Sequence, residues 1–485
     1  MRLIVTRVFI FFCISLSLYG RQCIAKNLDL KAAIAYAMVH NPHLKALQLD
    51  KTVRLHELKI LKQKFSPQVA FNLSLSVQNE DYFNEDFNEK KLHTYPSLRL
   101  LTPVGTQIEV FTEQNVGYEQ YQRNSGSAVH VTLEQPLLKG RSKTVNKWSI
   151  ENGAALNEIQ ELLLNQASSQ VIYNVILRYH ALMLALDNVS SQERWLAQAQ
   201  RFYDSMKIKV DVGRAPSSDL TSSMLQLNQA KGYVATAQFA HKEAIRAFKE
   251  VIGWEEEEEL SITPISFSKH LFTLDKNSLI QQVMDNDIES KILNLNKQRL
   301  KTQLAVAKDQ QLIDLKLKGD ITVGRYHVYG NNNVPDIYDS TVYNAPFVHN
   351  SGNYSAHLLM SIPLTGKEER KHFALATKVE QQKNADEFNA HQRILVTHTT
   401  GLLEKLELQK QQLTLSRQQL SLAQKNYDDA LMKLEAGRTS MFEVTSLREK
   451  LHDMQISHNS TKIAYLDIIA QVDFSTGVLP QKWLS

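Results

Sequence analysis

The chain has 485 residues, 22% of them charged, yet its formal net charge is only +4. Such a balance lacks the basic stripe of a nucleic-acid-binding protein, so we expect no nucleic-acid partner. A chain of this length ordinarily holds several globular domains. Its helical segments are too long for such domains, and no segment approaches the roughly 20 apolar residues of a membrane-spanning helix.

The N-terminal segment has the organisation of an export signal. Arg2 and Arg7 supply a basic start, Val8 to Tyr19 form a stretch of twelve mostly apolar residues, and Ala25 offers a small residue for cleavage. We therefore predict a signal peptide over residues 1–25. The alternative is a buried N-terminal helix.

Cleavage at this point would remove both cysteines, Cys13 and Cys23, and three arginines, which lowers the net charge from +4 to +1. The mature chain would then need no disulfide, although its compartment is oxidising. Lipidation of Cys23 is disfavoured because Arg21-Gln22 is a poor context in front of a lipid-bearing cysteine.

The next segment predicts a helix from Leu28 to Phe65, interrupted at Asn41-Pro42 because proline lacks a backbone donor. The period then changes to two, since Val69 to Val77 and Val129 to Leu133 alternate apolar and polar residues. Residues 92–116 look like a further hairpin, which either joins these strands or lies beside them. Strands of about ten residues with one apolar face suit a membrane β-barrel, and a soluble sheet that caps the helices is the alternative.

A very long helix follows. Residues 154–212 contain neither glycine nor proline, and such a run is typical of a coiled coil or a long bundle. We expect a helix from Lys143 to Asp211, which at 1.5 Å per residue spans roughly 100 Å. Gly213 suits its left-handed C-cap, and a shorter helix from Asp219 to Glu250 returns.

The second half repeats this order. The acidic run Glu255–Glu259 is interpreted as a solvated linker, with an acidic patch for a partner protein as the alternative. The remaining predicted elements are a helix at Leu274–Leu312, a strand opening at Leu315, a polar loop at Tyr329–Val348, a strand at Ser355–Ile362, a helix at Lys367–Glu435, a turn at Gly437 and a helix at Phe442–Ser475.

The two halves are copies of each other at an offset of 224 residues. The segment Ala199–Asp204 recurs as Ala423–Asp428, and Gly253 recurs as Gly477. A heptad row recurs as well: Leu182, Val189, Leu196, Tyr203 and Val210 correspond to Leu406, Leu413, Leu420, Tyr427 and Leu434. A seven-residue apolar repeat keeps one seam facing a neighbouring helix.

These patterns predict a mostly α fold with a membrane β-barrel, built from a duplicated half with long coiled-coil hairpins and antiparallel strands. We divide the chain into a signal peptide at 1–25, repeat 1 opening helices at 26–66, repeat 1 strands at 67–138, a repeat 1 helical hairpin at 139–253, a linker at 254–272, a repeat 2 opening helix at 273–313, repeat 2 strands at 314–364, a repeat 2 helical hairpin at 365–478 and a tail at 479–485.

This order of elements, given twice, resembles the TolC-like outer-membrane efflux proteins (outer-membrane factors) over essentially the whole mature chain. The pieces that carry the resemblance are the Asn41-Pro42 break, Gln135-Pro136-Leu137-Leu138, and the glycine-then-acid turns Gly213/Asp219 and Gly437/Glu443. The resemblance implies a homotrimer in the Gram-negative outer membrane, with a lipid-embedded barrel and a periplasmic helical tunnel. It also implies an inner-membrane transporter with a periplasmic adaptor (membrane fusion) protein, or a type I secretion system, as partners.

The strands agree with an oligomer, because two strands per half cannot close a barrel and unpaired edges cannot remain in lipid. Four strands in each of three copies would give twelve. We therefore expect a passive export duct for small molecules or proteins, with its cargo left open. A periplasmic adaptor, which would carry one hairpin between compact β domains, is the alternative, as is a coiled-coil scaffold.

The resemblance further implies a gate at the inner tip of the tunnel, where acidic side chains face the axis and polar links hold the helices closed. Asp219 and Glu443 could instead be first-turn acids that stabilise a helix dipole. Ser446 stands where some members carry a second acid. The matching positions are Gly213, Arg214, Asp219, Gly437, Arg438 and Glu443, and the positions for packing or gating above the tip are Tyr203, Asp204, Tyr427 and Asp428.

No catalytic chemistry is expected. The sequence has no phosphate-binding glycine loop and no nucleophile motif, so we predict that the protein is not an enzyme and has no cofactor. The pairs His40/His43 and His391/His398 have the spacing of metal ligands but no convincing third ligand, so no metal is expected.

Overall fold

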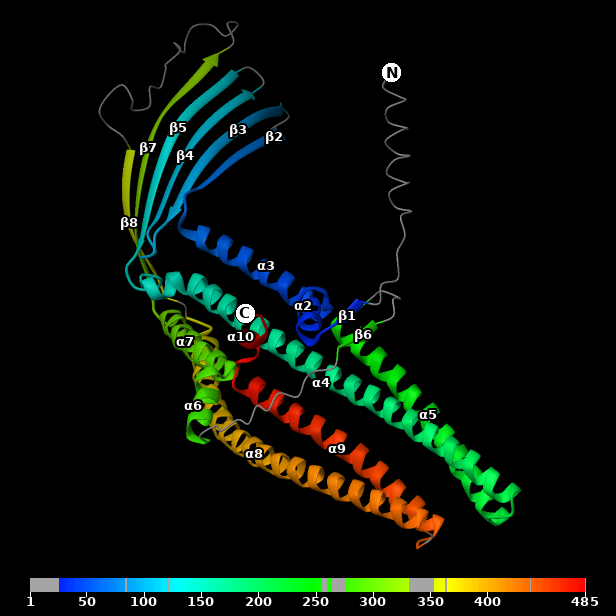
Figure 1. Ribbon diagram of the computed structural model, residues 1–485. Helices are drawn as coiled ribbons and strands as arrows, with labels where there is room; N and C mark the ends of the chain where they lie inside the picture. The colour runs from blue at the N-terminus through cyan, green and yellow to red at the C-terminus, as the bar shows by residue number, and fades with distance from the viewer. Residues whose placement is uncertain are drawn as a thin grey trace, which may run out of the picture. The chain divides into compact units, whose positions relative to one another are not determined.

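A computed structural model describes residues 26–82, 85–119, 122–254, 260–263, 276–330, 353–362, 364–436 and 438–484 (Figure 1). The chain forms two compact units. Unit 1 comprises Met1–Gln48, Leu163–Ile288 and Gln392–Ser485, and unit 2 comprises Leu49–Leu162 and Glu289–His391. The predicted signal peptide, the Glu255–Glu259 linker, Gly437 and most of the Tyr329–Val348 loop lie outside the described residues.

The two longest helices have the predicted bounds. They are α4 (Lys143–Asp211) and α8 (Lys367–Glu435), each of 69 residues. The shorter returning helices are α5 (Ser217–Ile252) and α9 (Met441–Ser475). The prediction of two long helical hairpins is confirmed. Neither long helix contains a proline, so nothing interrupts its backbone hydrogen bonds along the heptads. No helix within the described residues is long and apolar enough to cross a membrane.

Each half opens with a broken helix. The first break is the predicted one, between α2 (Leu30–His40) and α3 (Pro42–Lys62), and the turn η1 (Gln63–Phe65) follows. The prediction of one helix over Leu274–Leu312 is wrong, because α6 (Lys276–Asn286) and α7 (Ile288–Asp309) are separate.

This second break contains no proline, and a side chain marks it instead. Asn286 Nδ2 donates to the Thr476 carbonyl at 2.8 Å, as Asn41 Nδ2 donates to the Val251 carbonyl at 3.2 Å in the first half. In both halves an asparagine at the helix break therefore binds the end of the returning helix.

The repeated glycines end the returning helices beside these breaks. Gly253 and Gly477 adopt φ values of 70° and 71°, the left-handed region that glycine enters at no steric cost. A Cβ on Gly253 would lie 3.0 Å from the His40 carbonyl oxygen, and one on Gly477 would lie 3.2 Å from Asn286 Cβ. The close approach and the backbone conformation both explain why glycine occurs at these two positions. The C-terminal helix α10 (Leu479–Leu484) follows.

An antiparallel sheet of six strands belongs to unit 2, in the order β2-β3-β4-β5-β7-β8 (Figure 1). Residues 92–116 lie within β3 and β4, so the further hairpin joins the sheet, and the expected four strands are corrected to six. Alternation was weak there because polar residues and Pro96 interrupt the apolar positions of β3. The strands are β2 (Gln68–Tyr82), β3 (Glu85–Leu101), β4 (Gln107–Glu119), β5 (Gln122–Pro136), β7 (Asp314–Gly330) and β8 (Asn353–Ser361).

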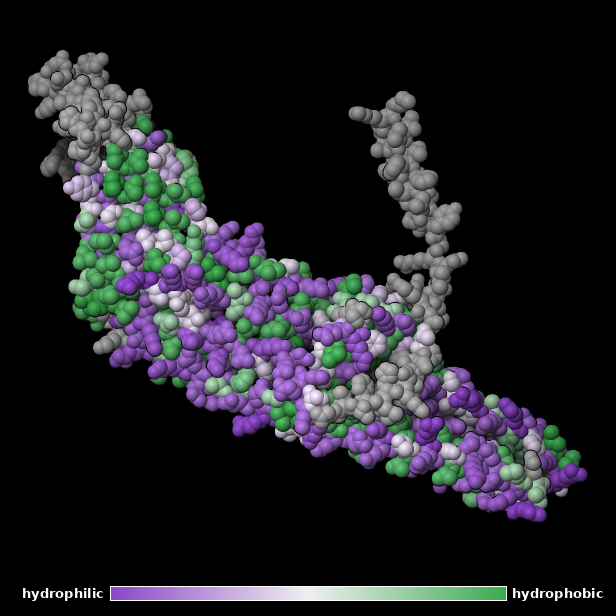
Figure 2. Space-filling model, turned by 60° about the vertical axis from the view of Figure 1, so that its left-hand side comes forward, coloured by the Kyte–Doolittle hydropathy of each residue, from purple (hydrophilic) through white to green (hydrophobic). Residues whose placement is uncertain are grey.

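The sheet has one apolar face and one polar face. On β2, Val69, Phe71 and Leu73 are each more than 60% exposed in the single chain, and Gln68 and Asn72 point to the other face. Hydrophobic residues gather on the visible side of the sheet, whereas hydrophilic residues cover most of the visible surface of the helices (Figure 2). Such a two-sided sheet leaves a large apolar surface without cover in one chain.

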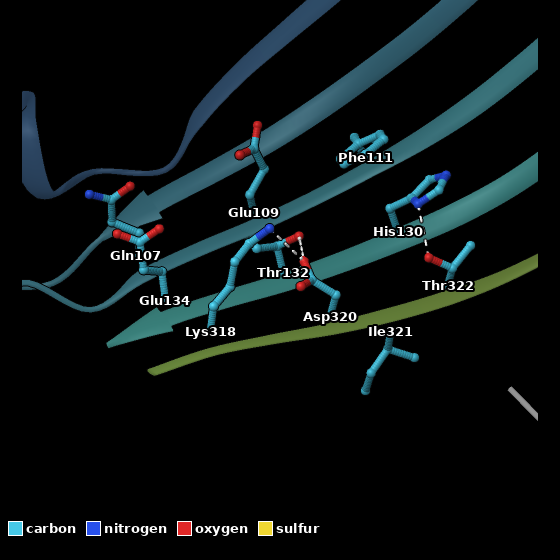
Figure 3. A pocket seen from close by; sticks show the side chains of 10 residues that line it. All are labelled: Gln107, Glu109, Phe111, His130, Thr132, Glu134, Lys318, Asp320, Ile321 and Thr322. Carbon is cyan, nitrogen blue, oxygen red and sulfur yellow. Dashed lines mark hydrogen bonds and ion pairs between the residues drawn. The ribbon is translucent and has the colours of Figure 1, made fainter. Parts of the chain in front are cut away.

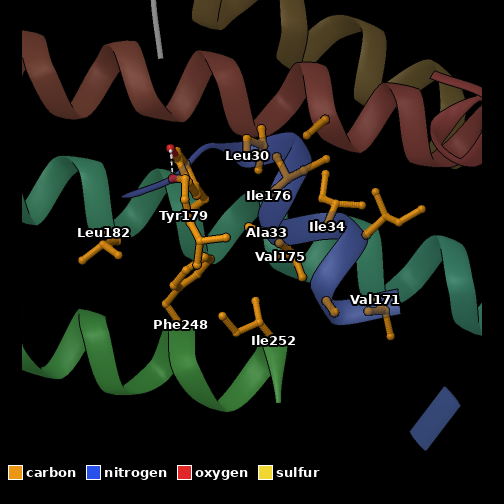
Figure 4. Close-up of a cluster of buried hydrophobic side chains, with 14 of the residues drawn as sticks. Leu30, Ala33, Ile34, Val171, Val175, Ile176, Tyr179, Leu182, Phe248 and Ile252 are labelled. Atoms are coloured by element: carbon orange, nitrogen blue, oxygen red, sulfur yellow. Dashed lines mark hydrogen bonds between the residues drawn. The ribbon is translucent and has the colours of Figure 1, made fainter. Parts of the chain in front are cut away.

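The main core lies in unit 1, where α2, α4 and α5 meet (Figure 4). Tyr179 and Phe248 are fully buried there and pack edge to face at 5.8 Å. The Tyr179 hydroxyl donates to the Thr263 carbonyl at 2.5 Å, next to the parallel pair β1 (Lys26–Leu28) and β6 (Leu260–Ile262). Burial, helped by the nearby Asp29 carboxylate, raises the pKa of Tyr179 to about 12, so this hydroxyl remains a donor at physiological pH.

Candidate functional site

The turn between α4 and α5 holds the first set of predicted tip residues. Gly213 has φ 70°, its amide donates to the Val210 carbonyl at 2.9 Å, and the Arg214 amide donates to Lys209 at 2.7 Å. This pattern is a Schellman C-cap. The Arg214 side chain is exposed, and Asp219 lies half-buried in the first turn of α5.

The turn between α8 and α9 repeats this arrangement. The Arg438 amide donates to the Lys433 carbonyl at 2.8 Å, and its side chain is exposed. Ser440 caps α9 by accepting from the Glu443 amide at 3.3 Å, and the Glu443 carboxylate accepts a hydrogen bond from the Thr439 hydroxyl. The serine and the acid three residues later have the spacing of a capping box. Glu443 therefore contacts Thr439 from the first turn of α9, a position at which an acid stabilises the helix dipole.

The four residues predicted for packing or gating above the tip lie on the long helices α4 and α8. Tyr203 packs against the small core of Trp195, Ala199, Leu227 and Ala230. Asp204 accepts from Gln200 Nε2 at 3.0 Å, and Asp428 accepts from Gln424 Nε2 at 2.9 Å, each within one helix. Tyr427 is half-buried in α8. These contacts favour packing over gating for Tyr203.

A buried arginine, which the sequence analysis did not single out, joins the two helical hairpins. Arg448 on α9 is 5% exposed, and its guanidinium lies 4.7 Å from the Trp195 ring centroid and 5.1 Å from that of Phe202, both on α4. One of its terminal nitrogens donates to Gln226 Oε1 on α5 at 2.8 Å. Arg448 thus contacts both helices of the first hairpin from the second. We call Arg448, Trp195, Phe202, Gln226 and His452 the inter-hairpin cluster.

The electrostatics of this cluster are unusual because the positive charge faces aromatic rings. Cation–π contacts of this kind contribute roughly 0.5–2 kcal/mol, more when they are desolvated. Burial lowers the pKa of Arg448, and Tyr427 and Glu449 act in the opposite direction. His452, one turn along, stacks on Trp195 with centroids 4.6 Å apart. A signal for the cluster existed in the sequence, because the residues 224 positions from Arg448 and Trp195 are Met224 and Gln419, so the repeat is broken there.

The buried His452 predicts a pH dependence of stability. Burial lowers its pKa, only partly offset by Asp453, so the unfolded chain binds protons more readily than the folded chain just below pH 6.5. The contribution of neutral His452 to the free energy of unfolding is therefore fully present above about pH 6.5. It is lost as the pH falls towards the pKa of His452 in the folded chain. We expect His452→Phe, which can retain the ring stack, to reduce the fall in thermal midpoint between pH 7.5 and 5.5. An equal fall in parent and variant would contradict this, and His458→Phe shows how much the half-buried His458 contributes.

Charged and polar side chains line the polar face of the sheet (Figure 3). Arg99 contacts Glu109 at 2.9 Å across β3 and β4, and Lys318 contacts Asp320 at 3.2 Å on β7. Thr132 on β5 also donates to Asp320 at 2.9 Å. Ile321 points away from these residues to the opposite face (Figure 3). The polar face therefore suits contact with water and not with a hydrophobic layer.

No group of three metal-ligating side chains occurs in the part of the chain that the structure describes. His40 Nδ1 lies 3.0 Å from the Tyr36 carbonyl and its ring stacks on that of Tyr36. The histidine pairs therefore gain no further ligand from the fold among the described residues.

Comparisons with known proteins address the fold. No family model matches the sequence, and no curated protein matches it. Among solved structures, CusC, described in connection with transmembrane channel formation, is 14% identical, with a TM-score of 0.66 and 95% of each chain covered. A membrane protein from Pseudomonas aeruginosa is 11% identical (TM-score 0.67, 92% of each chain covered). The CmeC outer membrane channel of Campylobacter jejuni is 14% identical (TM-score 0.65, 92% of this chain and 85% of that chain covered).

These likenesses extend over nearly the whole chain, and they confirm the predicted fold of long helical hairpins and antiparallel strands. The fold is that of TolC-like outer-membrane channels. At 10–14% identity the comparison concerns the fold alone.

Proposed function

We propose that this protein is the outer-membrane channel of a tripartite efflux system, through which cargo passes passively. The observation that carries the proposal is the two-sided sheet. One face presents Val69, Phe71 and Leu73 without cover, and the other presents ion pairs such as Arg99–Glu109. A strand wall between lipid and a water-filled lumen requires this alternation. Channels of the same fold support the proposal.

The edges of the sheet favour a closed ring of copies, which we propose to be a homotrimer, as the resemblance to TolC-like channels implies. Five successive antiparallel pairings separate β2 from β8, so the two edge strands run in opposite directions. A second copy can therefore add its β8 to β2 as a further antiparallel strand, and a ring of copies leaves no free edge in lipid. The transport energy would come from an inner-membrane transporter, reached through a periplasmic adaptor protein or within a type I secretion system.

Membrane fractionation followed by gel electrophoresis of unheated and heated samples tests this function. We expect the protein in the outer-membrane fraction, as a species of about three chains that heat converts to a single chain, and we expect it to form channels in planar bilayers. Release of the protein into the soluble fraction by osmotic shock would contradict the proposal, and it would favour the adaptor or scaffold alternative.

The helical tips are the proposed entrance, and the inter-hairpin cluster is the proposed lock within each chain. We expect Arg448→Ala to raise single-channel conductance severalfold, because Trp195, Phe202 and Gln226 then lose the side chain that joins the hairpins. The lost contacts amount to roughly 1–2 kcal/mol per chain. Lys450→Ala is the matched control, since it removes one exposed positive charge from the same helix. Equal conductance for both variants would place the lock elsewhere.

We also propose a gating role for the charged residues at the helical tips, Arg214, Arg438 and Glu443. Arg214 and Arg438 are exposed at the tips, and the link that we propose for each of them is to a neighbouring copy. Arg214→Ser with Arg438→Ser should then raise conductance by releasing that link. Glu443→Gln should lower cation selectivity and keep the helix cap, because glutamine also fits a capping box. Parental selectivity in Glu443→Gln would leave Glu443 as a cap alone.

A further inference from the structure

The two halves differ in the number of strands that they give to the sheet. The second half supplies β7 and β8 between its opening helices and its long helix, whereas the first half supplies β2, β3, β4 and β5. The strands β3 and β4 therefore form an inserted hairpin (Glu85–Glu119) that the duplication does not account for. Since β2 pairs with β3 and β4 with β5, this inserted hairpin lies inside the sheet and not at its edge.

The register aligns the faces of the inserted hairpin with those of its neighbours. Direct partners across antiparallel strands place their side chains on the same face. Two complete rows cross all six strands, one mostly apolar and one polar. The first is Val69, Leu98, Val110, Val131, Ile321 and Tyr354, and the second is Gln68, Arg99, Glu109, Thr132, Asp320 and Ser355. A hairpin outside the wall would not require its apolar and polar residues to align with those of the neighbouring strands.

Side chains fix the inserted hairpin on the polar face. The Arg99–Glu109 pair lies between its two strands. The Glu113 carboxylate lies 3.2 Å from His93 Nε2 and 3.2 Å from His130 Nε2, so it connects β3, β4 and β5. Side-chain contacts therefore join the two strands of the inserted hairpin to each other and to β5.

The turn of the inserted hairpin packs against the end of β5 and the segment that leads from β5 to α4. Gly105 is buried at φ +84°, and a Cβ there would lie 2.3 Å from the Gly140 carbonyl oxygen. The Thr106 hydroxyl donates to Gln135 Oε1 at 2.6 Å. Glycine at position 105 permits both the backbone conformation and this approach. The hairpin is thus anchored at its turn as well as along both strands.

We infer that the assembled channel has a wall of eighteen strands, six from each of three copies, and that the partner at each sheet edge is a second copy of this chain. This inference rests on the proposed function. With strands about 4.8 Å apart and tilted by about 40°, eighteen strands give a wall about 36 Å across, whereas twelve give about 24 Å. Walls of 16–18 strands enclose an aqueous channel. The outer-membrane end of this duct would then be about half as wide again as a twelve-stranded one, so it places little limit on the size of the cargo.

Electron microscopy of the full chain, purified in detergent, tests the width of the wall. Views along the threefold axis should show a ring about 36 Å across at the level of the strands. A threefold ring about 24 Å across would overturn the inference and leave the channel proposal standing. A protein that is a soluble monomer would overturn both.

Two cysteine pairs that share one position test the strand order in the same trimers. Val110 and Val131 are direct partners on β4 and β5, at a Cα separation of about 5 Å that a disulfide can bridge. Val69 lies at the same level on β2, and with β3 and β4 in between it stands about 14 Å from Val131, beyond the reach of a disulfide. The pair Val69/Val131 is therefore the matched control, because it becomes adjacent only if the inserted hairpin leaves the sheet.

We expect mild oxidation to join Val110→Cys with Val131→Cys within one chain in nearly every copy, and to leave Val69→Cys with Val131→Cys as free thiols. Alkylation followed by mass measurement of the trimer band distinguishes the two states. A disulfide in the Val69/Val131 pair, or none in the Val110/Val131 pair of assembled trimers, would overturn the inference.

Discussion

Leu196→Pro is expected to abolish assembly of the trimer. Residue 196 lies near the middle of the second half of α4, against the core of Trp195, Ala199, Leu227 and Ala230. Proline there removes the backbone hydrogen bond to residue 192 and clashes with that carbonyl, at a cost of about 3 kcal/mol or more per chain. Three copies in one assembly all carry the defect, and a kink would misplace every residue of α4 that follows. Leu413→Pro should act in the same way in α8. The yield of the trimer on unheated gels measures the effect.

Lys143→Pro is the matched control for this prediction. Lys143 is the first residue of α4, where the amide has no partner within the helix and the proline backbone angle is already suitable. We expect a yield near that of the parent chain. A normal yield from Leu196→Pro would mean that assembly does not depend on a continuous α4 packed against this core.

The long helices could be predicted to the residue because their signals are local. A run without glycine or proline from 154 to 212, a heptad row and Gly213 are enough to place most of α4 and its C-terminal end. The break at Asn286 could not be predicted in this way. It is accompanied by a hydrogen bond from Asn286 to the Thr476 carbonyl, 190 residues away, and an asparagine within a helical pattern does not reveal such a partner.

The inserted hairpin and the inter-hairpin cluster illustrate two further limits. The sequence predicts a hairpin at residues 92–116, but Pro96 and the polar residues of β3 leave its place open, and only the register shows that it lies within the sheet. Arg448 looked like one more charge on a long amphipathic helix. Its burial depends on Trp195 and Phe202, which belong to the other hairpin. Yet both features lie where the halves cease to be copies, so a departure from an internal repeat is itself a useful signal for a specialised site.

Leu73→Arg is expected to prevent insertion of the sheet into the outer membrane. Leu73 is 62% exposed on the apolar face of β2, two residues from Phe71 and Leu75 on the same face. An arginine on the lipid side of a strand costs about 2–4 kcal/mol near the bilayer midplane and much less near its surfaces. Each trimer would carry three such charges in one ring, so the penalty should reach roughly 6–12 kcal/mol. The amount of heat-modifiable trimer in the outer-membrane fraction measures the effect, and we expect little or none.

Ser74→Arg introduces the same charge one residue along the same strand. Successive side chains of a strand point to opposite faces, so residue 74 shares the polar face with Asn72 and with its β3 partner His93. An arginine there would meet water, and we expect trimer yield and outer-membrane location close to those of the parent. The pair isolates the direction of the side chain, because the charge, the strand and the distance from the edge are nearly the same. If Leu73→Arg inserts as well as Ser74→Arg, the apolar face of β2 does not contact lipid, and a soluble sheet that caps the helices becomes the better interpretation.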